Sequence, residues 1–463
     1  MIYFLPNEVL LEIFDHYRMD GVGRTSYFPW KWHRLAHVCR TWRHIIFASS
    51  HYLNLQLLCT YGTPVRKNLG YLPALPIVIT LRGCFEDSDE DNILAALEHP
   101  DRVRVVELCV SYSLLEKMAT VMQEPFPALT RLSLQSRQYL TPVLPDTFLG
   151  GCAPRLQKIY LEGIPFPAAP TLLLSARDLV DVELRDIPPE GYISPEAMVT
   201  SLAVLPRLKY LRFGPDTSFP DRIRQPPSTR TVLPALTTFH FDGFFEYLEN
   251  FVAQIDTPQL DCLRIECWSV NFQFPQLCEF IDRSEKLKLY FRRMDLHIQP
   301  DIVVIELVHR GQSSFKFSIG DEGIGQVLSQ ISGMLSNVDR LFISSVFPRY
   351  YDGELGNGIR WLELFHPFTA VKALSVEDRL SDHVILALKD VTGARAAEVL
   401  PALELLCLEK RPVASVKEFV AARQNVGRPV TFISKVKEFK KRLGPNVREW
   451  ENVPYRLPTP SLL

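Results

Sequence analysis

The sequence predicts a mixed α/β protein in which a small helical module at the amino terminus precedes a long, irregular array of strands and helices. Helical spacing of apolar residues within the first fifty positions predicts the module. From residue 77 onward a short apolar motif returns every few tens of residues, and prolines, 35 in the 463-residue chain, often precede it. We expect this array to form a solenoid with a parallel sheet on its concave face and helices on its convex face.

Composition and charge restrict the classes of protein to which the chain can belong. Hydrophobic residues make up 47% of it and charged residues 22%, as in folded globular proteins. A formal net charge of −2 excludes a generally basic nucleic-acid-binding protein, and no apolar run approaches the ~18 residues of a membrane span. Nine scattered cysteines favour reduced thiols, and the amino terminus lacks the basic start of a secretory signal. We expect a cytoplasmic or nuclear protein, or one present in both compartments, with no nucleic-acid or membrane partner.

Two short amphipathic helices are predicted in the amino-terminal module. Pro6 stands where a first-turn proline costs a helix no hydrogen bond, and an apolar stripe follows it. Helices this short cannot bury their apolar surface alone, so they must pack on each other, on the rest of the chain or on a partner. The first stripe contains Val9, Leu10, Ile13, Phe14 and Tyr17, and the second contains Leu35, Val38, Trp42, Ile45 and Ile46.

Residues 5–14, LPNEVLLEIF, and residues 35–46, LAHVCRTWRHII, together resemble an F-box. F-boxes attach substrate receptors to the Skp-type adaptor of cullin-based SCF ubiquitin ligases, although the connection here, residues 20–30, is longer than usual. The alternative is that both segments are core helices of a cap on a larger domain. The resemblance implies that ten residues face the adaptor or hold the helices that do, namely Leu5, Pro6, Val9, Leu10, Ile13, Phe14, Leu35, Val38, Cys39 and Trp42.

Local composition predicts the domain boundaries. Proline and glycine gather shortly after residue 60, which is typical of a linker, and residues 77–81 then form the first clear strand pattern. We assign residues 1–60 to the F-box domain, 61–76 to the linker and 77–434 to the repeats. Residues 435–463 are expected to form a basic helix, over 435–443, and a loose tail.

The repeated motif is an apolar residue, two others, an apolar residue, one other and a third apolar residue. The early copies begin 23 to 29 residues apart, which resembles the period of leucine-rich repeats, and the last three begin 33 and 32 apart. Residues 287 and 302–319 match the motif only in part, although strands are expected there. The copies begin at Val103, Leu129, Leu156, Leu179, Leu208, Leu236, Leu260, Val338, Val371 and Leu403.

Helical patterns occupy the intervals between copies of the motif. Ser194 followed by Pro195 and Glu196 predicts a capped helix, and residues 244–255 and 415–423 carry further amphipathic patterns. An F-box followed by irregular leucine-rich repeats is similar to large F-box protein families of fungi. This resemblance implies a substrate receptor of an SCF-type ligase that binds the Skp-type adaptor through its F-box and a target protein through its repeats. The alternative is a repeat scaffold for protein interactions without ligase association.

The side chains that alternate with the buried motif positions should point out of the concave sheet face. Basic and acidic residues are mixed among them, whereas a nucleic-acid groove needs a continuous basic stripe with aromatic residues. A mixed face with tyrosine and arginine suits a protein partner, and a plain solvated face is the alternative. The candidate target-binding residues are Arg131, Lys158, Tyr160, Arg185, Tyr210, Arg212 and His240.

Three clusters that could carry chemistry are better explained structurally. His33, His37, Cys39 and His44 lie among arginines that would repel a cation. The spacing of Cys262, Cys267 and Cys278 lacks the paired CxxC of a zinc site, and residues 320–325 place two carboxylates where a phosphate loop needs none. We therefore expect no catalytic residues, metal or cofactor, and the target protein cannot be identified from these patterns.

Overall fold

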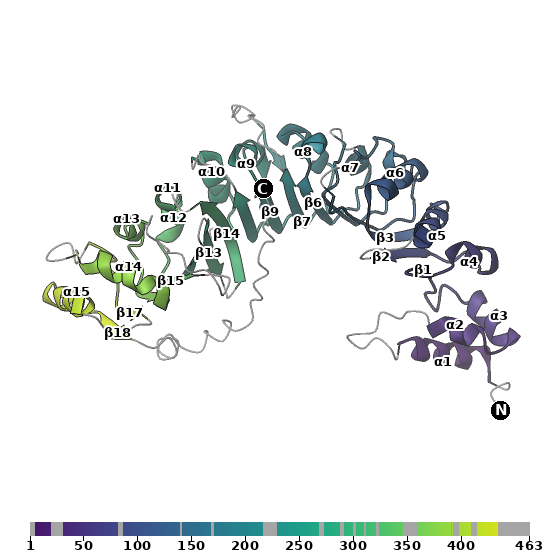
Figure 1. Ribbon diagram of the computed structural model, residues 1–463, viewed down its shortest axis with the longest axis horizontal. Helices are drawn as coiled ribbons and strands as arrows, with labels where there is room; N and C mark the ends of the chain where they lie inside the picture. Colours follow the sequence, from purple (N-terminus) through teal and green to yellow (C-terminus); the bar gives the residue numbers. More distant parts are fainter. Residues whose placement is uncertain are drawn as a thin grey trace. The chain divides into compact units, whose positions relative to one another are not determined.

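The computed structural model describes residues 5–19, 31–81, 87–138, 141–167, 171–215, 229–267, 273–287, 291–299, 302–309, 312–320, 324–345, 359–389, 391, 398–408 and 414–433. The chain divides into two compact units, Met1–Ile193 and Ser194–Leu463. This division falls inside residues 77–434, which the sequence groups as one repeat region. In each unit, helices line one face of a mostly parallel sheet (Figure 1).

In the described part of the amino-terminal module, the helices are α1 (Asn7–Met19), α2 (Lys31–Ala36) and α3 (Arg40–Ala48). The carbonyl of Pro6 accepts the N–H of Leu10 at 3.1 Å, so the first turn of α1 begins at the proline as its position predicts. Cys39 is the N-cap of α3, and its Sγ accepts the N–H of Trp42 at 3.4 Å. The second predicted helix is therefore two helices, α2 and α3, that meet just before this cap.

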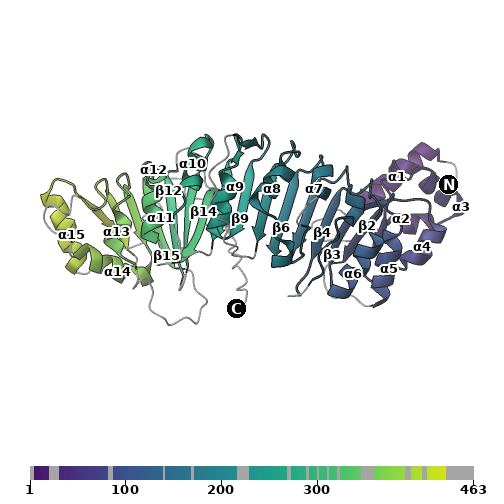
Figure 2. The same cartoon turned by 90° about the horizontal axis from the view of Figure 1, so that it is seen from above.

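The described residues of the first unit form six parallel strands in sequential order. The strands are β1 (Leu57–Cys59), β2 (Ile77–Leu81), β3 (Val103–Cys109), β4 (Arg131–Gln135), β5 (Lys158–Glu162) and β6 (Asp181–Ile187). Figure 2 shows β2, β3, β4 and β6 side by side. The intervening helices are α4 (Val65–Tyr71), α5 (Asp87–Leu97), α6 (Tyr112–Val121), α7 (Thr171–Ser175) and the 3-10 helices η2 (Phe148–Gly151) and η3 (Pro189–Gly191).

Residues 61–76, predicted as a linker, contain a helix that belongs to the repeat layer. Helix α4 buries Val65 completely, and Leu75 is also buried. Strand β1 already pairs with β2, with Leu57 opposite Ile77, so the sheet begins before the predicted first strand. Gly62 and the prolines of this stretch flank α4, and Gly70 lies in its last turn, which is why composition alone suggested a linker.

The main sheet of the second unit has the strand order β7-β9-β11-β14-β13-β12-β15-β16-β17-β18. Its strands are β7 (Tyr210–Pro215), β9 (Thr238–Gly243), β11 (Cys262–Cys267), β12 (Arg293–Ile298), β13 (Ile302–His309), β14 (Gln312–Gly320), β15 (Arg340–Ser345), β16 (Ala373–Val376), β17 (Leu405–Leu408) and β18 (Thr431–Ile433). Two short strands, β8 (Thr231–Val232) and β10 (Ile255–Asp256), pair separately. The helices are α8 (Pro195–Leu202), α9 (Phe245–Val252), α10 (Pro275–Arg283), α11 (Ile324–Gln330), α12 (Ser332–Leu335), α13 (Trp361–Phe365), α14 (Asp378–Lys389) and α15 (Ala414–Asn425).

The prediction of a wholly parallel sheet is wrong at β13, which runs antiparallel to both β12 and β14. Only residues 299–301 separate β12 from β13, and only residues 310–311 separate β13 from β14. Parallel neighbours need a crossover of a dozen or more residues, so connections this short permit antiparallel pairing only. Strands are present here as expected, although the motif that marks the parallel strands is weak.

The core of each unit lies between the sheet and its helices. In the first unit Leu132 and Leu134 of β4 are fully buried on the helix side. In the second unit Phe213 lies 4.9 Å from Phe251 of α9 and 5.2 Å from Phe241, measured between ring centroids. Aromatic residues thus fill the space that leucines fill in the first unit. The predicted helix and tail at 435–463 lie outside the described residues.

Candidate protein-interaction surfaces

An apolar surface remains accessible on the helical module. Leu5, Val9, Ile13 and Val38 are 37%, 40%, 44% and 58% exposed, and Pro6 is exposed as well. Val9 and Ile13 are four residues apart on α1 and therefore share one helix face. Four large apolar side chains left accessible in a module of this size are typical of a docking surface.

The other predicted adaptor-binding residues hold the module together. Leu10 and Phe14 form the adjacent face of α1 and are buried, as is Leu35 of α2. The ring of Trp42, which is half-buried, lies 4.8 Å from the ring of Phe14, and Cys39 caps α3. The ten residues thus divide into an exposed group and a packing group. The sequence shows one apolar stripe on α1 but not which part of it faces inward.

One histidine of the module takes part in packing, whereas His16, His37 and His44 are exposed. The imidazole of His33 stacks on Trp32 with a centroid separation of 3.7 Å. Burial, and secondarily the neighbouring His37, lower the pKa of His33, so its neutral form is favoured. Over the described part of the chain, no group of three or more His, Cys, Asp or Glu side chains is arranged to hold a metal ion.

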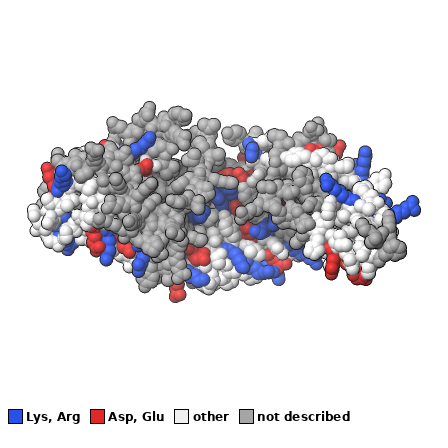
Figure 3. Space-filling view, turned by 90° about the horizontal axis from the view of Figure 1, so that it is seen from below, with Lys and Arg blue, Asp and Glu red and all other residues white. Residues whose placement is uncertain are grey.

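The open face of the first sheet carries polar side chains in rows across the strands. Register places Arg131, Lys158 and Asp181 in one row, and Ser133, Tyr160 and Glu183 in the next. A hollow of about 300 Å³ lies over these rows and is lined by them together with Glu107 and Gln135. Among the residues drawn in colour, basic and acidic side chains are intermixed on the side of the molecule that Figure 3 shows.

Tyr160 is the centre of a hydrogen-bond network in this hollow. Its hydroxyl donates to the carboxylate of Glu162 and accepts from Arg185 Nη1 and Gln135 Nε2, each at 3.2 Å. Burial and the hydrogen bond to Glu162 raise the pKa of Tyr160, which keeps the phenol protonated at neutral pH. A network of this kind holds an aromatic ring and several charged groups in fixed positions.

Ion pairs neutralise the charges around Tyr160. Arg131 Nη1 lies 3.1 Å from Glu107 Oε1, and Lys158 Nζ lies 3.1 Å from Asp181 Oδ2. Both basic side chains stay about half exposed, so they can still contact a partner. The structure therefore brings together four of the predicted target-binding residues, namely Arg131, Lys158, Tyr160 and Arg185.

The remaining three predicted target-binding residues lie together in the second unit. The hydroxyl of Tyr210 is 3.1 Å from His240 Nδ1, and Arg212 Nε donates to Asp242 Oδ2 at 2.9 Å. Register pairs Arg212 with His240 across β7 and β9. Alternation along β9 places His240 and Asp242 on the same open face, so they lie beside Tyr210 and Arg212 of the neighbouring strand β7.

Further polar residues on this face were not predicted. Arg293 Nε donates to Asp295 Oδ1 at 2.7 Å, and the Arg293 guanidinium lies 4.9 Å from the ring of Phe342. His297 Nδ1 is 2.7 Å from the hydroxyl of Ser344. Arg293, Asp295 and His297 belong to β12, where the motif is weak and gave no strand register. Phe342 and Ser344 belong to β15, whose motif copy begins at Val338, so alternation along β15 could have placed them on the open face.

None of the described helices has both the length and the apolar content that a membrane crossing requires. No curated protein sequence matches the chain. Residues 2–56 match the model of the F-box-like family, and this range includes all ten predicted adaptor-binding residues. The comparison, together with the exposed apolar surface of α1, supports an F-box-like domain at the amino terminus of this chain.

Proposed function

We propose that this chain is a substrate receptor of an SCF-type, cullin-based ubiquitin ligase. Its F-box-like domain would bind a Skp-type adaptor, and the open sheet faces of its repeats would hold a target protein. The repeats would be of the irregular leucine-rich kind found in large fungal F-box families. The chain itself would be no enzyme, because the other subunits of the ligase would carry out the ubiquitin transfer in the cytoplasm or nucleus.

The observation that carries the proposal is the exposed pair Val9 and Ile13 in a region similar to the F-box-like family. Leu10 and Phe14 already fill the interior of the module, so these two side chains are not needed there. Exposed apolar side chains on a rigid helix cost little entropy when a partner covers them. Val9 and Ile13 therefore support a docking surface on a module whose own core is already filled.

The polar sheet faces support the second half of the proposal. They contain tyrosine and arginine, which are enriched in protein interfaces, and these side chains are held by hydrogen bonds before any partner arrives. A face that is organised in advance loses less conformational entropy on binding.

The proposal is tested by replacing exposed apolar residues of α1. We expect Val9→Asp combined with Ile13→Asp to weaken the complex with a purified Skp-type adaptor by ~30-fold or more, because central apolar anchors contribute ~2 kcal/mol or more. Isothermal titration calorimetry with the full chain measures the dissociation constant. Leu386→Asp is the matched control, since Leu386 of α14 is also a large exposed apolar residue, 65% accessible, but lies outside the module.

Two results would contradict the adaptor proposal. One is equal adaptor affinity for the double variant and the Leu386→Asp control. The other is a folded wild-type chain that stays monomeric beside excess adaptor, which would favour the alternative of a repeat scaffold without ligase association.

A further inference from the structure

The hollow on the open face of the first sheet is centred on a row with a small residue in it. Register places Ser133 of β4 between Glu107 of β3 and Tyr160 of β5, and Glu183 of β6 follows Tyr160 in the same row. Ser133 has the smallest side chain among the residues that line the hollow. The longer side chains around it stand roughly perpendicular to the sheet, so a space of about 300 Å³ remains beside them.

The residues that line the hollow carry a negative charge overall. Two of them are basic and three are acidic, which gives a net formal charge of −1. Each basic side chain is paired with one carboxylate at 3.1 Å, Arg131 with Glu107 and Lys158 with Asp181. Glu183 is the third carboxylate, so the acidic charges exceed the basic ones by one. A cation that enters the hollow balances this charge, whereas an anion adds to it.

The row through Ser133 contains the groups that can hold a cation. A glutamate stands at each end of the row, Glu107 on β3 and Glu183 on β6, and these two strands are about 14 Å apart. Tyr160 lies between them and lines the hollow, and Arg185 Nη1 donates to its hydroxyl at 3.2 Å. The face of a tyrosine ring attracts a cation, and a ring that is already held in place loses little entropy when a partner binds.

We propose that this hollow receives a single basic side chain, arginine or lysine, of the target protein; this inference rests on the proposed role as a substrate receptor. The volume lies at the lower limit of ligand sites, which is ~300 Å³, and therefore suits one long side chain better than a larger ligand. The aliphatic part of that side chain would contact Tyr160. Its charged end would lie near the carboxylates of Glu107 and Glu183.

Short peptides test the charge preference with the full chain. Four acetylated and amidated pentapeptides carry two glycines on each side of a central arginine, lysine, citrulline or glutamate. Saturation-transfer difference NMR measures their dissociation constants at peptide concentrations up to about 10 mM. We expect the arginine and lysine peptides to bind about tenfold or more tightly than the citrulline peptide, because citrulline has nearly the shape of arginine but no charge.

Two substitutions locate this binding in the hollow. Glu183→Gln keeps the shape of the side chain but removes its charge, and should weaken binding of the arginine peptide by about fivefold or more. Ser133→Tyr fills the space and should abolish binding. Ser133 is only half-buried on the open face, so the larger side chain does not enter the core, and thermal unfolding of the variant checks this. Glu98→Gln is the matched control, because Glu98 is an exposed carboxylate of the same unit outside the hollow, and it should leave the affinity unchanged.

Four results would overturn the proposal. They are equal affinity for the arginine and citrulline peptides, equal affinity of wild type and Glu183→Gln for the arginine peptide, the absence of signal from every peptide, and tighter binding of the glutamate peptide. The last of these would show that Arg131 and Lys158 select an acidic side chain instead. The peptide measurements need no adaptor. Loss of adaptor binding would therefore remove the receptor proposal and leave the hollow as a site for basic peptides, whereas failure of the peptides would leave adaptor binding untouched.

Discussion

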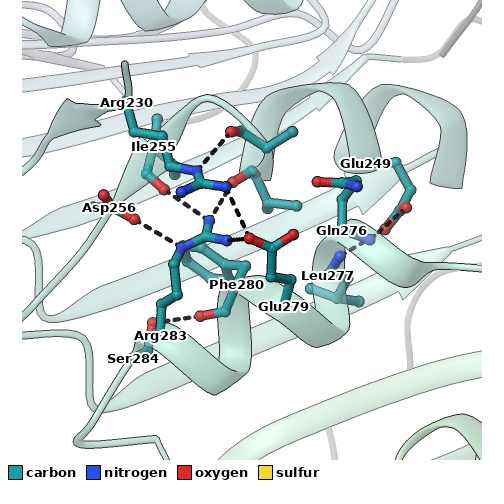
Figure 4. A network of polar contacts seen from close by, with 12 residues as sticks. Arg230, Glu249, Ile255, Asp256, Gln276, Leu277, Glu279, Phe280, Arg283 and Ser284 are labelled. Atoms are coloured by element: carbon teal, nitrogen blue, oxygen red, sulfur yellow. Dashed lines mark hydrogen bonds and ion pairs between the residues drawn. The ribbon is translucent and has the colours of Figure 1, made fainter. Parts of the chain in front are cut away.

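Glu249 shows how a single buried carboxyl can couple the stability of a repeat to pH. It is 1% exposed on α9, and its two carboxylate oxygens accept the N–H groups of Gln276 and Leu277 at 2.9 and 2.8 Å (Figure 4). These bonds satisfy the first turn of α10, but burial outweighs them and raises the pKa of Glu249 to about 7. The side chain therefore changes its charge in the neutral range.

We predict that stability decreases as Glu249 ionises. The carboxyl keeps its proton in the folded chain up to about pH 7, whereas in the unfolded chain it loses it near its ordinary value of 4.5. Its stabilising contribution is complete below pH 4.5 and is lost as pH rises through 7, by about 3 kcal/mol in all.

Urea unfolding of wild type and Glu249→Gln between pH 4.5 and 8 measures this contribution as the difference between the two curves. The thiol of Cys278 nearby does not interfere, because burial and Glu249 raise its pKa to about 11. Parallel stability curves for the two proteins would contradict the prediction.

At the scale of elements, side chains of one repeat satisfy the exposed backbone groups of its neighbour. The N–H of Arg66 in α4 donates to Asn92 of α5 at 3.3 Å, and that of Tyr112 in α6 donates to Gln138 at 2.7 Å. Each partner lies about one repeat further along the chain. The N–H groups of a first helical turn, which have no partner within their own helix, thus bind side chains of the next repeat. These polar contacts fix the position of neighbouring repeats in addition to apolar packing.

Arg283 at the end of α10 makes the most extensive of these contacts in Figure 4. Its guanidinium lies 2.9 Å from Asp256 and 2.8 Å from Glu279, and it donates to the carbonyls of Val252 and Ile255 at 3.3 and 3.4 Å. The side chain is 23% exposed, so solvent screens these interactions only in part.

We predict that Arg283→Ala lowers the free energy of unfolding by ~1–2 kcal/mol, because it removes charge-assisted hydrogen bonds that join α9, α10 and β10. Arg360→Ala is the control. That arginine pairs with Glu363 at 3.2 Å but is 80% exposed, and such surface pairs contribute below ~1 kcal/mol. Thermal and urea unfolding compare the two variants, and equal losses would show that burial of the network contributes nothing.

Periodicity predicts elements when both strand and helix are regular, and it fails where the chain reverses. The motif at Leu129 predicted both the position of β4 and the side chains on its open face. Once Leu132 and Leu134 are buried, alternation determines that the residues that alternate with them point outward. The hairpin of β13 and β14 lacks the motif, so its direction and the residues beside it, such as Arg293, were not predictable. Helix α4 was missed because its boundaries are rich in proline and glycine.

The candidate sites show the same limit. Spacing placed Val9, Leu10, Ile13 and Phe14 in one apolar stripe on α1. Only the packing of α2 and α3 determines that Leu10 and Phe14 are buried while Val9 and Ile13 stay exposed. On the sheet, alternation identified Tyr160 and Arg185 as outward-pointing residues. Their shared hydrogen bond depends on the register between β5 and β6, which a single sequence does not encode directly.

At the scale of the whole molecule, each unit is a stack in which most elements contact only their neighbours. In the second unit, β9 pairs with β7 and β11, while β17 pairs with β16 and β18. Stability in such a stack is approximately the sum of the repeats and their adjoining interfaces. A destabilising substitution in one repeat should therefore lower the stability of adjacent repeats only, unlike in a protein with one central core.

Phe251→Ala tests this locality, because Phe251 is fully buried and its ring lies 4.9 Å from Phe213 and 5.6 Å from Phe239. Removing a core phenylalanine costs ~3–5 kcal/mol. We predict that amide hydrogen exchange accelerates strongly in β7, β9 and β11 and little in β16–β18.

Phe419→Ala, in the buried face of α15, should produce the opposite gradient, with the largest change in β17 and β18. If either variant accelerated exchange equally throughout the unit, the sheet would unfold as one cooperative body. The polar open face would then respond as a whole to a partner bound at any one strand.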